Sequence, residues 1–564
     1  MHAAELLIRC LETEGVRFVF GVPGEEILEI MDGLRNSSIR FIVTRHEQGA
    51  AFMADAYGRL TGNAGVCLAT LGPGATNLTT GIADATLDFA PLVAITGQTS
   101  LDRVHKESHQ FVDVVRILEK ITKWNIRATR PEVIPEVVRK AFMLAQQEKP
   151  GACHIELTTD VQRAETQADV TPLMTRPARR SSPDGLALER AAKLIGEARS
   201  PLILAGSSAV RRPEAAMELR RFAKNSGIPV THTFMGKGAM PDHDPLSLMP
   251  LGMPGGNDIC GSGMCHADVV IAVGYEQVEY PPERWNHDCS KHIVHIDYMP
   301  SEVDRFYRTD VEVVADIRET LEQLGGLVRY TASEDEKECV RALSAAASAE
   351  RRGDVDGTSV PVKPQEIIRE IRQALGEEDI LVSDVGAHKM WIARYYPTYL
   401  PGTVLLSNGY SAMGFGLPAA IAAKLAFPER KVVAAVGDGG FLMTLMEMET
   451  AVRLGLPVTV VVWVDRSYGL IKWKQEAEHR TVFGVDFGNP DWVKLAESFG
   501  AKGYLVERPG DLHRMLEAAL GSTQSSVIAV PVDAEENMRL TRRMAEAPCP
   551  VGDRCQKHRA TART

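Results

Sequence analysis

The stretch that most constrains the fold runs from residue 431 to 469, with the sequence KVVAAVGDGGFLMTLMEMETAVRLGLPVTVVVWVDRSYG. An apolar run at 432–436 is followed by the turn GDGG at 437–440, by apolar residues at helical spacing over 441–454, and by a β-branched run at 458–464. This order of strand, turn, helix and strand predicts a parallel βαβ unit. We therefore expect an α/β fold with a wound, mainly parallel sheet flanked by helices.

The two aspartates that follow these strands are expected to lie together. A seven-residue strand climbs ~23 Å and a helix of about fourteen residues descends ~21 Å, so the second strand ends level with the first. Asp438 and Asp465 should then meet at the carboxyl-end edge of the sheet, where open α/β sheets bind ligands. Two carboxylates beside a helix N-terminus suit a divalent cation that clamps a phosphate. Each aspartate alone would more often cap a helix or start a turn.

Length and composition bound the class of protein. A chain of 564 residues is too long for one core and predicts about three domains. The 63 basic and 74 acidic residues give a net charge of −11, which does not favour nucleic acid as the main partner. No apolar run approaches the roughly eighteen residues of a membrane span, and the N-terminus mixes charges with apolar residues, unlike a secretory signal. We therefore predict a cytoplasmic protein with no membrane partner.

Nine cysteines, an odd number in a long chain, predict reduced thiols rather than a disulfide framework. Two pairs allow a metal site to be considered, namely Cys260 with Cys265, and Cys549 with Cys555 followed by His558. The first pair has no second pair nearby in the sequence, and the second pair lies in a polar tail. Small buried or incidental thiols are therefore favoured over zinc.

The chain divides into three α/β regions separated by polar, periodicity-free linkers at 162–185 and 331–362. The expected strands are 18–20, 39–44, 65–71 and 91–96 in the first region, 201–205, 268–274 and 292–297 in the second, and 380–383 with the βαβ strands in the third. Residues 72–77 are predicted to form a loop too rich in glycine and proline to be helical. The arginines and lysines after Asp533 form a charge run that is usually solvated and mobile, although it could cover an active site.

Five motifs together resemble acetolactate synthase, large catalytic chain. Asp438, Asp465 and the carbonyl of Ser467 match the thiamine diphosphate signature that holds magnesium, with Asp465 replacing the usual asparagine by another hard oxygen ligand. The other four are FGVPGEE (20–26), RHEQGAAFMADAYGRLTG (45–62), LGPGATNLTTGIADATLDFAPLVAITGQ (71–98) and SNGYSAMGFGLPAA (407–420). The resemblance covers nearly the whole chain. It implies a pyrimidine-binding domain (1–165), a central domain (186–330), a diphosphate- and metal-binding domain (363–545) and a tail (546–564).

The resemblance also implies catalytic residues. Glu47 matches the glutamate that hydrogen-bonds the cofactor's pyrimidine ring and promotes the imino tautomer, which removes a proton from the thiazolium carbon. The resulting carbanion attacks pyruvate, and the ring is the electron sink when CO₂ leaves. Gln110 matches a glutamine near the reacting carbons, whose amide favours ligation over protonation. Without the resemblance, Glu47 could be a surface glutamate at a helix start. The remaining cofactor-binding positions are Pro23, Gly24, Thr70, Pro73, Asn77, Gly386, Ala387, His388, Ser411, Met413, Gly437, Asp438, Gly439, Gly440, Tyr468, Gly469 and Leu470.

Departures from the family pattern refine the prediction. The stretch VGYEQVEYPPERW at 273–285 looks like the catabolic, flavin-free branch and makes FAD doubtful. Lys474 stands where the biosynthetic enzymes place a tryptophan that favours 2-ketobutyrate, and Trp473 lies one place early. Ala387 replaces a glutamine that is usual in the family, which puts one hydrogen bond to the diphosphate in doubt. Met413, the family's wedge beneath the cofactor, would otherwise be read as a core methionine.

The sequence thus predicts a thiamine diphosphate- and Mg²⁺-dependent enzyme that converts two pyruvates to 2-acetolactate and CO₂. In this family the two halves of each active site come from different subunits, which implies a homodimer or homotetramer. A simple 2-keto acid decarboxylase, or another thiamine diphosphate-dependent carboligase or lyase, remains an alternative, and His109 beside Gln110 would fit decarboxylase-like release. A catalytically silent cofactor-binding subunit is a third possibility.

Overall fold

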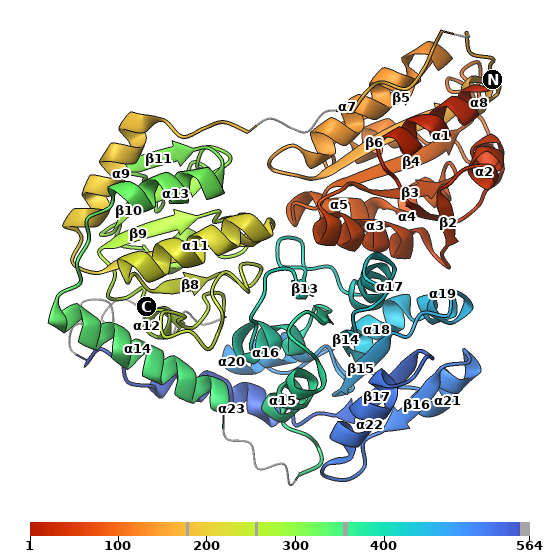
Figure 1. Cartoon of the computed structure of the whole chain (residues 1–564). Helices are drawn as coiled ribbons and strands as arrows, with labels where there is room; N and C mark the ends of the chain where they lie inside the picture. The colour runs from red at the N-terminus through yellow and green to blue at the C-terminus, as the bar shows by residue number, and fades with distance from the viewer. Residues whose placement is uncertain (168, 176–179, 254–257, 354–358, 553–564) are drawn as a thin grey trace.

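The computed structural model describes residues 1–167, 169–175, 180–253, 258–353 and 359–552 (Figure 1). Within these residues the named strands form three sheets, and every pairing between named strands is parallel. The three sheets follow one another along the chain and occupy three different regions of Figure 1. The predicted α/β class with three wound parallel sheets is confirmed.

The first sheet has the strand order β2-β1-β3-β4-β6-β5. Its strands are β1 (Phe18–Gly21), β2 (Arg40–Val43), β3 (Gly65–Ala69), β4 (Leu92–Gln98), β5 (Trp124–Ala128) and β6 (Ala152–Thr158). Its α-helices are α1 (Ala3–Thr13), α2 (Leu28–Arg35), α3 (Glu47–Thr61), α4 (Pro73–Asn77), α5 (Thr79–Leu87), α6 (Val114–Leu118), α7 (Ile134–Gln146) and α8 (Thr159–Arg163).

The central sheet has the order β11-β10-β9-β7-β8. Its strands are β7 (Pro201–Ala205), β8 (Val230–His232), β9 (Val269–Val273), β10 (His292–Asp297) and β11 (Val311–Val314). The helices of this part are α9 (Gly185–Glu197), α10 (Ser207–Val210), α11 (Pro213–Ser226), α12 (Asp258–Gly261), α13 (Ile317–Leu327) and α14 (Glu334–Arg352).

The third sheet has the order β13-β12-β14-β15-β17-β16. Its strands are β12 (Ile380–Ser383), β13 (Val404–Leu406), β14 (Val432–Gly437), β15 (Thr459–Val464), β16 (Lys502–Leu505) and β17 (Ser526–Pro531). Its helices are α15 (Pro364–Ala374), α16 (Ala387–Tyr395), α17 (Gly416–Ala426), α18 (Asp438–Thr444), α19 (Glu447–Arg453), α20 (Gly469–Ala477), α21 (Trp492–Ser498), α22 (Asp511–Leu520) and α23 (Glu535–Glu546).

The predicted βαβ unit is present, with one correction. β14 and β15 are parallel neighbours, and Gly437 lies opposite Trp463, so the two strands end at the same edge of the sheet. The expected helix over 441–454 is instead two short helices, α18 and α19. Helix α18 begins earlier than expected, at Asp438, directly after the strand. The division into two helices does not alter where β15 ends.

Two sequence-based predictions about loops were wrong. The supposed loop 72–77 contains the short helix α4, which proline can begin because the first helical position needs no N–H donor. The supposed linker 331–362 contains the 19-residue helix α14. The side chain of Ser333 caps this helix by accepting a hydrogen bond from the Glu336 N–H, and Cys339, Leu343 and Ala347 form a buried stripe at a spacing of four. Residues 354–358 of that linker, and 168 and 176–179 of the first one, lie outside the described residues.

The first and third sheets share a core. Helix α3 packs against α17, and both helices are buried over almost their whole length in one apolar cluster that continues to β14. Polar contacts reinforce this interface, because the Glu447 carboxylate of α19 accepts hydrogen bonds from the backbone N–H groups of Arg45 and His46 at 3.0 and 3.1 Å. The start of α3, which carries Glu47, is therefore held against the third sheet.

Among the described residues, no helix combines the length and the apolarity that crossing a membrane requires.

Candidate active site

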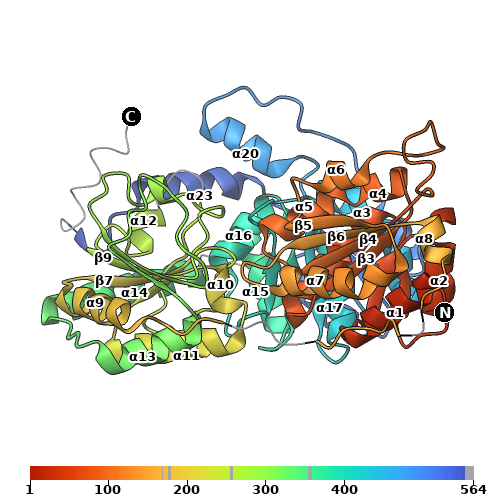
Figure 2. The same ribbon diagram turned by 90° about the horizontal axis from the view of Figure 1, so that it is seen from above.

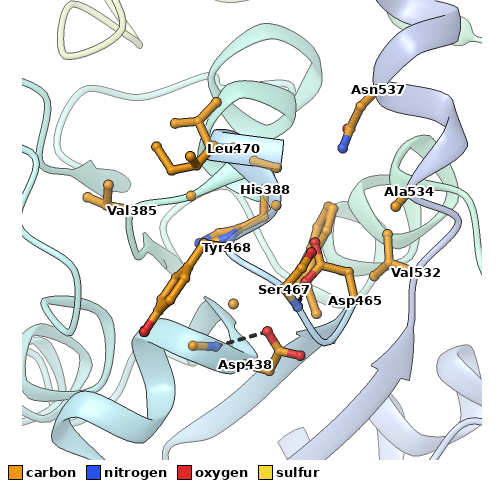
Figure 3. Close-up of a pocket in the computed structure, with 18 of the residues that line it drawn as sticks. Val385, His388, Asp438, Asp465, Ser467, Tyr468, Leu470, Val532, Ala534 and Asn537 are labelled. Carbon is orange, nitrogen blue, oxygen red and sulfur yellow. Dashed lines mark hydrogen bonds between the residues drawn. The ribbon is translucent and has the colours of Figure 1, made fainter. Parts of the chain in front are cut away.

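A cavity of about 310 Å³ lies at the carboxyl ends of β12, β14 and β15 (Figure 3). Fourteen of the residues predicted from the sequence line it, so motifs up to about eighty residues apart meet at one place. They are Gly386, Ala387, His388, Ser411, Met413, Gly437, Asp438, Gly439, Gly440, Asp465, Ser467, Tyr468, Gly469 and Leu470. The predicted meeting of the two aspartates at this edge is thus observed.

Asp438 is fixed by backbone donors from both strand ends. Its Oδ1 accepts from the Gly439 N–H at 2.9 Å, and its Oδ2 accepts from the Arg466 N–H at 2.8 Å and from the Asn489 amide at 2.7 Å. These bonds tie the end of β14 to the loop after β15. A carboxylate offers about four acceptor positions, so one remains for a cation.

Asp465 lies in an unfavourable environment for its charge. Burial, and then the neighbouring charge of Asp438, raise the pKa of Asp465 from 3.8 to about 7. Its Oδ1 accepts from the Ser467 N–H at 3.1 Å, which leaves most of its acceptor capacity unused. Burial also raises the pKa of Asp438. Two carboxylates with spare oxygens, one buried (Asp438) and one half-buried (Asp465), are a donor set that suits a hard divalent cation, and such a cation would relieve their repulsion.

Helix N-termini converge on the same cavity. Helices α16, α18 and α20 begin at Ala387, Asp438 and Gly469, and the residues at these starts line the cavity. The first N–H groups of a helix have no partner within the helix, and its dipole favours an anion there. Three such ends around one cavity suit a diphosphate.

Glycine at 469 is required by the closeness of Asp465. A Cβ added to Gly469 would lie 2.2 Å from Asp465 Oδ2, and one added to Gly440 would lie 2.4 Å from Asp384 Oδ2. Neither carboxylate could keep its position beside a larger residue. The glycines of the two motifs therefore let the backbone approach the acidic groups and the cavity.

Unpaired polar atoms support a polar ligand in this cavity. His388 Nε2 and Trp463 Nε1 are buried and have no hydrogen-bond partner in the described part of the chain, although both residues line the cavity. Burial lowers the pKa of His388 to about 3, so the ring is neutral. A buried donor or acceptor without a partner is costly unless a ligand satisfies it. These residues fit a bound diphosphate-type group.

Some lining residues were not found from the sequence. Trp463 looks like an ordinary strand residue. Asn489, which donates to Asp438 but does not line the cavity, lies in a loop without a motif. Val532 and helix α23 reach the cavity from the far end of the chain through Ala534 and Asn537 (Figure 3). Asn537 is held because its Oδ1 accepts from Trp391 Nε1 at 2.7 Å. Helix α23, which begins the arginine-rich segment, therefore covers the cavity. The basic residues beyond 552 lie outside the described part of the chain.

The remaining predicted site residues form a separate group on the first sheet. Glu47 is buried at the start of α3, and its Oε2 accepts from the Asn77 amide at 2.9 Å. Gly24 lies against Thr70, where an added Cβ would be 2.4 Å from Thr70 Cβ, and one added to Gly74 would be 3.3 Å from Glu47 Oε1. The small residues thus keep open the space beside the Glu47 carboxylate.

Pro23, Pro73 and Gln110 lie at the exposed edge of this group. Gln110 adopts a left-handed φ of 55°, and its carbonyl oxygen would be 2.5 Å from a Cβ added to Gly72. The segment that carries Gln110 therefore packs on the loop that carries Pro73. None of these residues, nor Glu47, is among those that line the cavity, all of which lie between 364 and 537.

Comparison with known proteins gives concordant matches. The chain matches the thiamine pyrophosphate enzyme N-terminal TPP-binding domain over 1–117, the central domain over 188–324 and the C-terminal TPP-binding domain over 384–530. It is 36% identical over 546 residues to an acetolactate synthase of Bacillus subtilis (strain 168), and the alignment covers 96% of this chain and 94% of the relative. It is also 36% identical over 539 residues to a catabolic acetolactate synthase of Raoultella terrigena, with 95% and 96% covered. A probable acetolactate synthase large subunit of Methanocaldococcus jannaschii is 36% identical over 558 residues, with 95% and 93% covered.

Proposed function

The chain belongs to the acetolactate synthase family of thiamine pyrophosphate enzymes, and from that premise we propose that it condenses two molecules of pyruvate to 2-acetolactate and CO₂. The observation that carries the proposal is the cavity in which Asp438 and Asp465, at adjacent strand ends, meet three helix N-termini. That arrangement suits the metal-bound diphosphate of this cofactor.

The proposed metal ligands are the carboxylates of Asp438 and Asp465 and the backbone carbonyl of Ser467, with Mg²⁺ as the ion. The N–H groups at the starts of α16, α18 and α20 would hold the diphosphate, together with His388. When bound, thiamine pyrophosphate supplies the electron sink for loss of CO₂. The protein's task is to position the cofactor and to keep water out, and α23 contributes through Asn537.

Glu47 is proposed to exchange a proton with the ring of the cofactor. Asn77 holds one carboxylate oxygen at 2.9 Å, so the other oxygen can face a ring nitrogen. Gln110 is proposed to orient the second substrate, since an amide hydrogen-bonds a carboxylate or carbonyl without supplying a titrating proton. This property favours carbon–carbon bond formation over release of an aldehyde.

We propose that a second copy of the chain completes each site. Of the residues that the structure describes, only ones from 364 to 537 line the cavity, whereas the Glu47 group belongs to the first sheet, so the described part of one chain does not bring them into the same cavity. Exposed apolar side chains surround this region, among them Tyr410, Met443 and Ile471 at 44, 42 and 48% exposure. Covering such side chains is what a subunit interface does. A homodimer is the smallest assembly that satisfies this requirement, and a homotetramer would satisfy it too.

The decisive experiment is a product assay with pyruvate, thiamine diphosphate and Mg²⁺. We expect 2-acetolactate as the main product and a loss of at least about a hundredfold in rate for Glu47→Gln. Asn36→Ala, at an exposed position after α2, is the matched control and should keep wild-type activity. Acetaldehyde as the main product would instead assign a decarboxylase, and cofactor binding without pyruvate consumption would assign a silent subunit.

The same assay tests the finer predictions. With 2-ketobutyrate added, the product ratio should show no preference for it, because Lys474 stands where the biosynthetic enzymes place a tryptophan. The purified protein should show no flavin absorbance. A yellow protein with flavin bands would contradict the flavin-free assignment.

A further inference from the structure

Three cysteines from distant parts of the sequence converge on the central part of the molecule. The Sγ atoms of Cys260, Cys265 and Cys549 all lie within 4.8 Å of one another. The distance between the Sγ atoms of Cys265 and Cys549 is 3.8 Å across 284 residues of sequence. In Figures 1 and 2 the end of α23 lies on the same side of the molecule as α12, which carries Cys260. The sequence could not reveal this group, because its two halves belong to different parts of the chain.

Cys260 and Cys265 lie on one tight turn. The Gly263 N–H donates to the Cys260 carbonyl at 3.1 Å, and the Cys265 N–H donates to the Ile259 carbonyl at 3.2 Å. Gly263 has a φ of 77°, a conformation that a residue with a side chain rarely adopts. This turn brings Cys265 back beside Cys260. Cys549 approaches from the other side, at a turn closed by the Gly552 N–H and the Cys549 carbonyl at 2.9 Å.

The spacing of the sulfurs fits one tetrahedral ion. With a Zn–S bond of about 2.3 Å, the edge of a ZnS₄ tetrahedron is about 3.8 Å, the separation between the sulfurs of Cys265 and Cys549. A disulfide between those two would require about 2.05 Å. In an iron–sulfur cluster the cysteines bind different irons, which places their sulfurs farther apart than the edge of one tetrahedron. The geometry therefore favours a mononuclear ion over both alternatives.

We propose that Cys260, Cys265 and Cys549 form a binding site for a single soft divalent metal ion, of which Zn²⁺ is the expected occupant. Three thiolates are the ligand set that such an ion prefers, and water or another ligand takes the fourth position. Ile259 and Val551 pack beside the sulfurs, whereas Cys260 is partly accessible and offers an entry path. The observations that support this site, and its test, do not depend on the proposed catalytic function.

The proposal applies to the reduced protein, because Cys265 is disulfide-bonded in the structure. A dithiol can break that bond by exchange: it becomes a cyclic disulfide, and its two protons go to the two released cysteine sulfurs. Binding of the ion then displaces the protons of the three thiols to the solvent. For the sulfur of Cys265, the metal-bound and the disulfide forms are thus alternative states, and a reducing environment favours the metal-bound form.

A neighbouring group of metal-ligand type is a weaker candidate. His266, Glu336 and Cys339 also lie within 4.8 Å of one another. Its polar atoms already bond within the protein, since His266 Nε2 and Ser200 Oγ contact Glu336 Oε2 at 2.9 and 2.7 Å. This group offers one thiol, one carboxylate and one imidazole, whereas the other group offers three thiolates, which a soft divalent ion prefers, so we assign the metal to the three-cysteine site.

The metal site would have a structural consequence for the active site. Helix α23 ends at Glu546, three residues before Cys549, and its other end lines the cofactor cavity through Asn537. An ion shared by Cys549 and the turn at 260–265 would fasten the end of this helix to the central part of the molecule. It would close a loop of 284 residues, for which a crosslink restricts the unfolded chain strongly.

The test uses the full-length protein, reduced with a phosphine under anaerobic conditions, incubated with equimolar Zn²⁺ and freed of unbound metal. Elemental analysis should find about one Zn²⁺ per chain in the wild type and at least about a tenfold lower affinity in Cys260→Ser and in Cys549→Ser. Cys289→Ser, at an exposed cysteine outside the group, should retain the metal, and so should Cys339→Ser. Substitution by Co²⁺ should give thiolate-to-cobalt charge-transfer and tetrahedral d–d absorption.

Three results would overturn the proposal. They are a reduced wild type that retains no Zn²⁺, full retention by both Cys260→Ser and Cys549→Ser, and loss of metal in Cys339→Ser alone, which would assign the other group. Circular dichroism of Cys260→Ser will show that the variant is folded. The cobalt spectrum reports thiolate ligands directly and separates metal binding from any general loss of structure.

Discussion

Replacing Asp465 by asparagine should stabilise the metal-free protein at high pH. The change keeps the shape of the side chain and the oxygen that accepts from the Ser467 N–H, but it removes the charge that repels Asp438. The rise in the pKa of Asp465 from 3.8 to about 7 corresponds to up to about 4 kcal/mol of unfavourable free energy for the ionised group. The asparagine variant is free of this cost.

The number of protons bound in the folded and unfolded states determines whether the free energy of unfolding rises or falls with pH. Between pH 3.8 and about 7 the folded state retains a proton on Asp465 that the unfolded state has lost, so the free energy of unfolding falls as the pH rises. Above about pH 7 both states have lost this proton, and the free energy of unfolding no longer falls with pH because of Asp465. We therefore expect Asp465→Asn and wild type to have nearly equal stability at pH 4, and the variant to be more stable by up to about 4 kcal/mol at pH 8.

The assay is urea denaturation in the presence of a chelator, followed by tryptophan fluorescence at several pH values for both proteins. Asp465→Asn should also respond less than wild type to added Mg²⁺ at pH 8, because the ion no longer relieves a repulsion between two carboxylates. Parallel pH profiles for the two proteins, or a variant less stable than wild type at pH 8, would refute the reasoning.

Two further substitutions test local features. Gly469→Ala would place a Cβ 2.2 Å from Asp465 Oδ2 and should lower the affinity for Mg²⁺ by at least about tenfold, measured by activity against metal concentration. Gly488→Ala, at a position with open space around it, should leave this affinity unchanged. Equal Mg²⁺ affinities in the two variants would contradict the argument that Gly469 lets the backbone approach Asp465. Ser333→Ala removes the N-cap of α14 and should lower the free energy of unfolding by about 1 kcal/mol, whereas Ser344→Ala within the same helix should change it little. Urea denaturation measures both variants, and an equal decrease in the free energy of unfolding would argue against capping by Ser333.

The parts of the fold that the sequence predicted depend on local pattern. The apolar runs at 201–205 and 380–383 coincide with β7 and β12, because a buried parallel strand is apolar on both faces. The stretch at 292–297 also coincides with β10, although it contains two histidines and an aspartate. The placement of Asp438 and Asp465 at one edge followed from the lengths of the intervening elements, and it survived the break of the expected helix into α18 and α19.

What the sequence did not predict depends on distant contacts. Helix α14 was taken for a linker, because its alanines and serines resemble linker composition and its buried stripe appears only against a packing partner. Asn537 lines the cofactor cavity, and Cys549 lies beside Cys265, although in both cases the partners are far apart in the sequence. No periodicity within either segment encodes such contacts.

The central claim is that a cofactor cavity built by Asp438 and Asp465 is completed by Glu47 of another copy of the chain. The most direct measurement is the acetolactate-forming activity of hybrids obtained by co-expressing two differently tagged inactive variants, Glu47→Gln and Asp438→Ala, in equal amounts. If the sites are shared, half of the dimers are hybrids with one intact site of two, and activity should return to about a quarter of the wild-type value. Activity that stays at the level of the separate variants, with hybrids shown to be present by their two tags, would contradict the account.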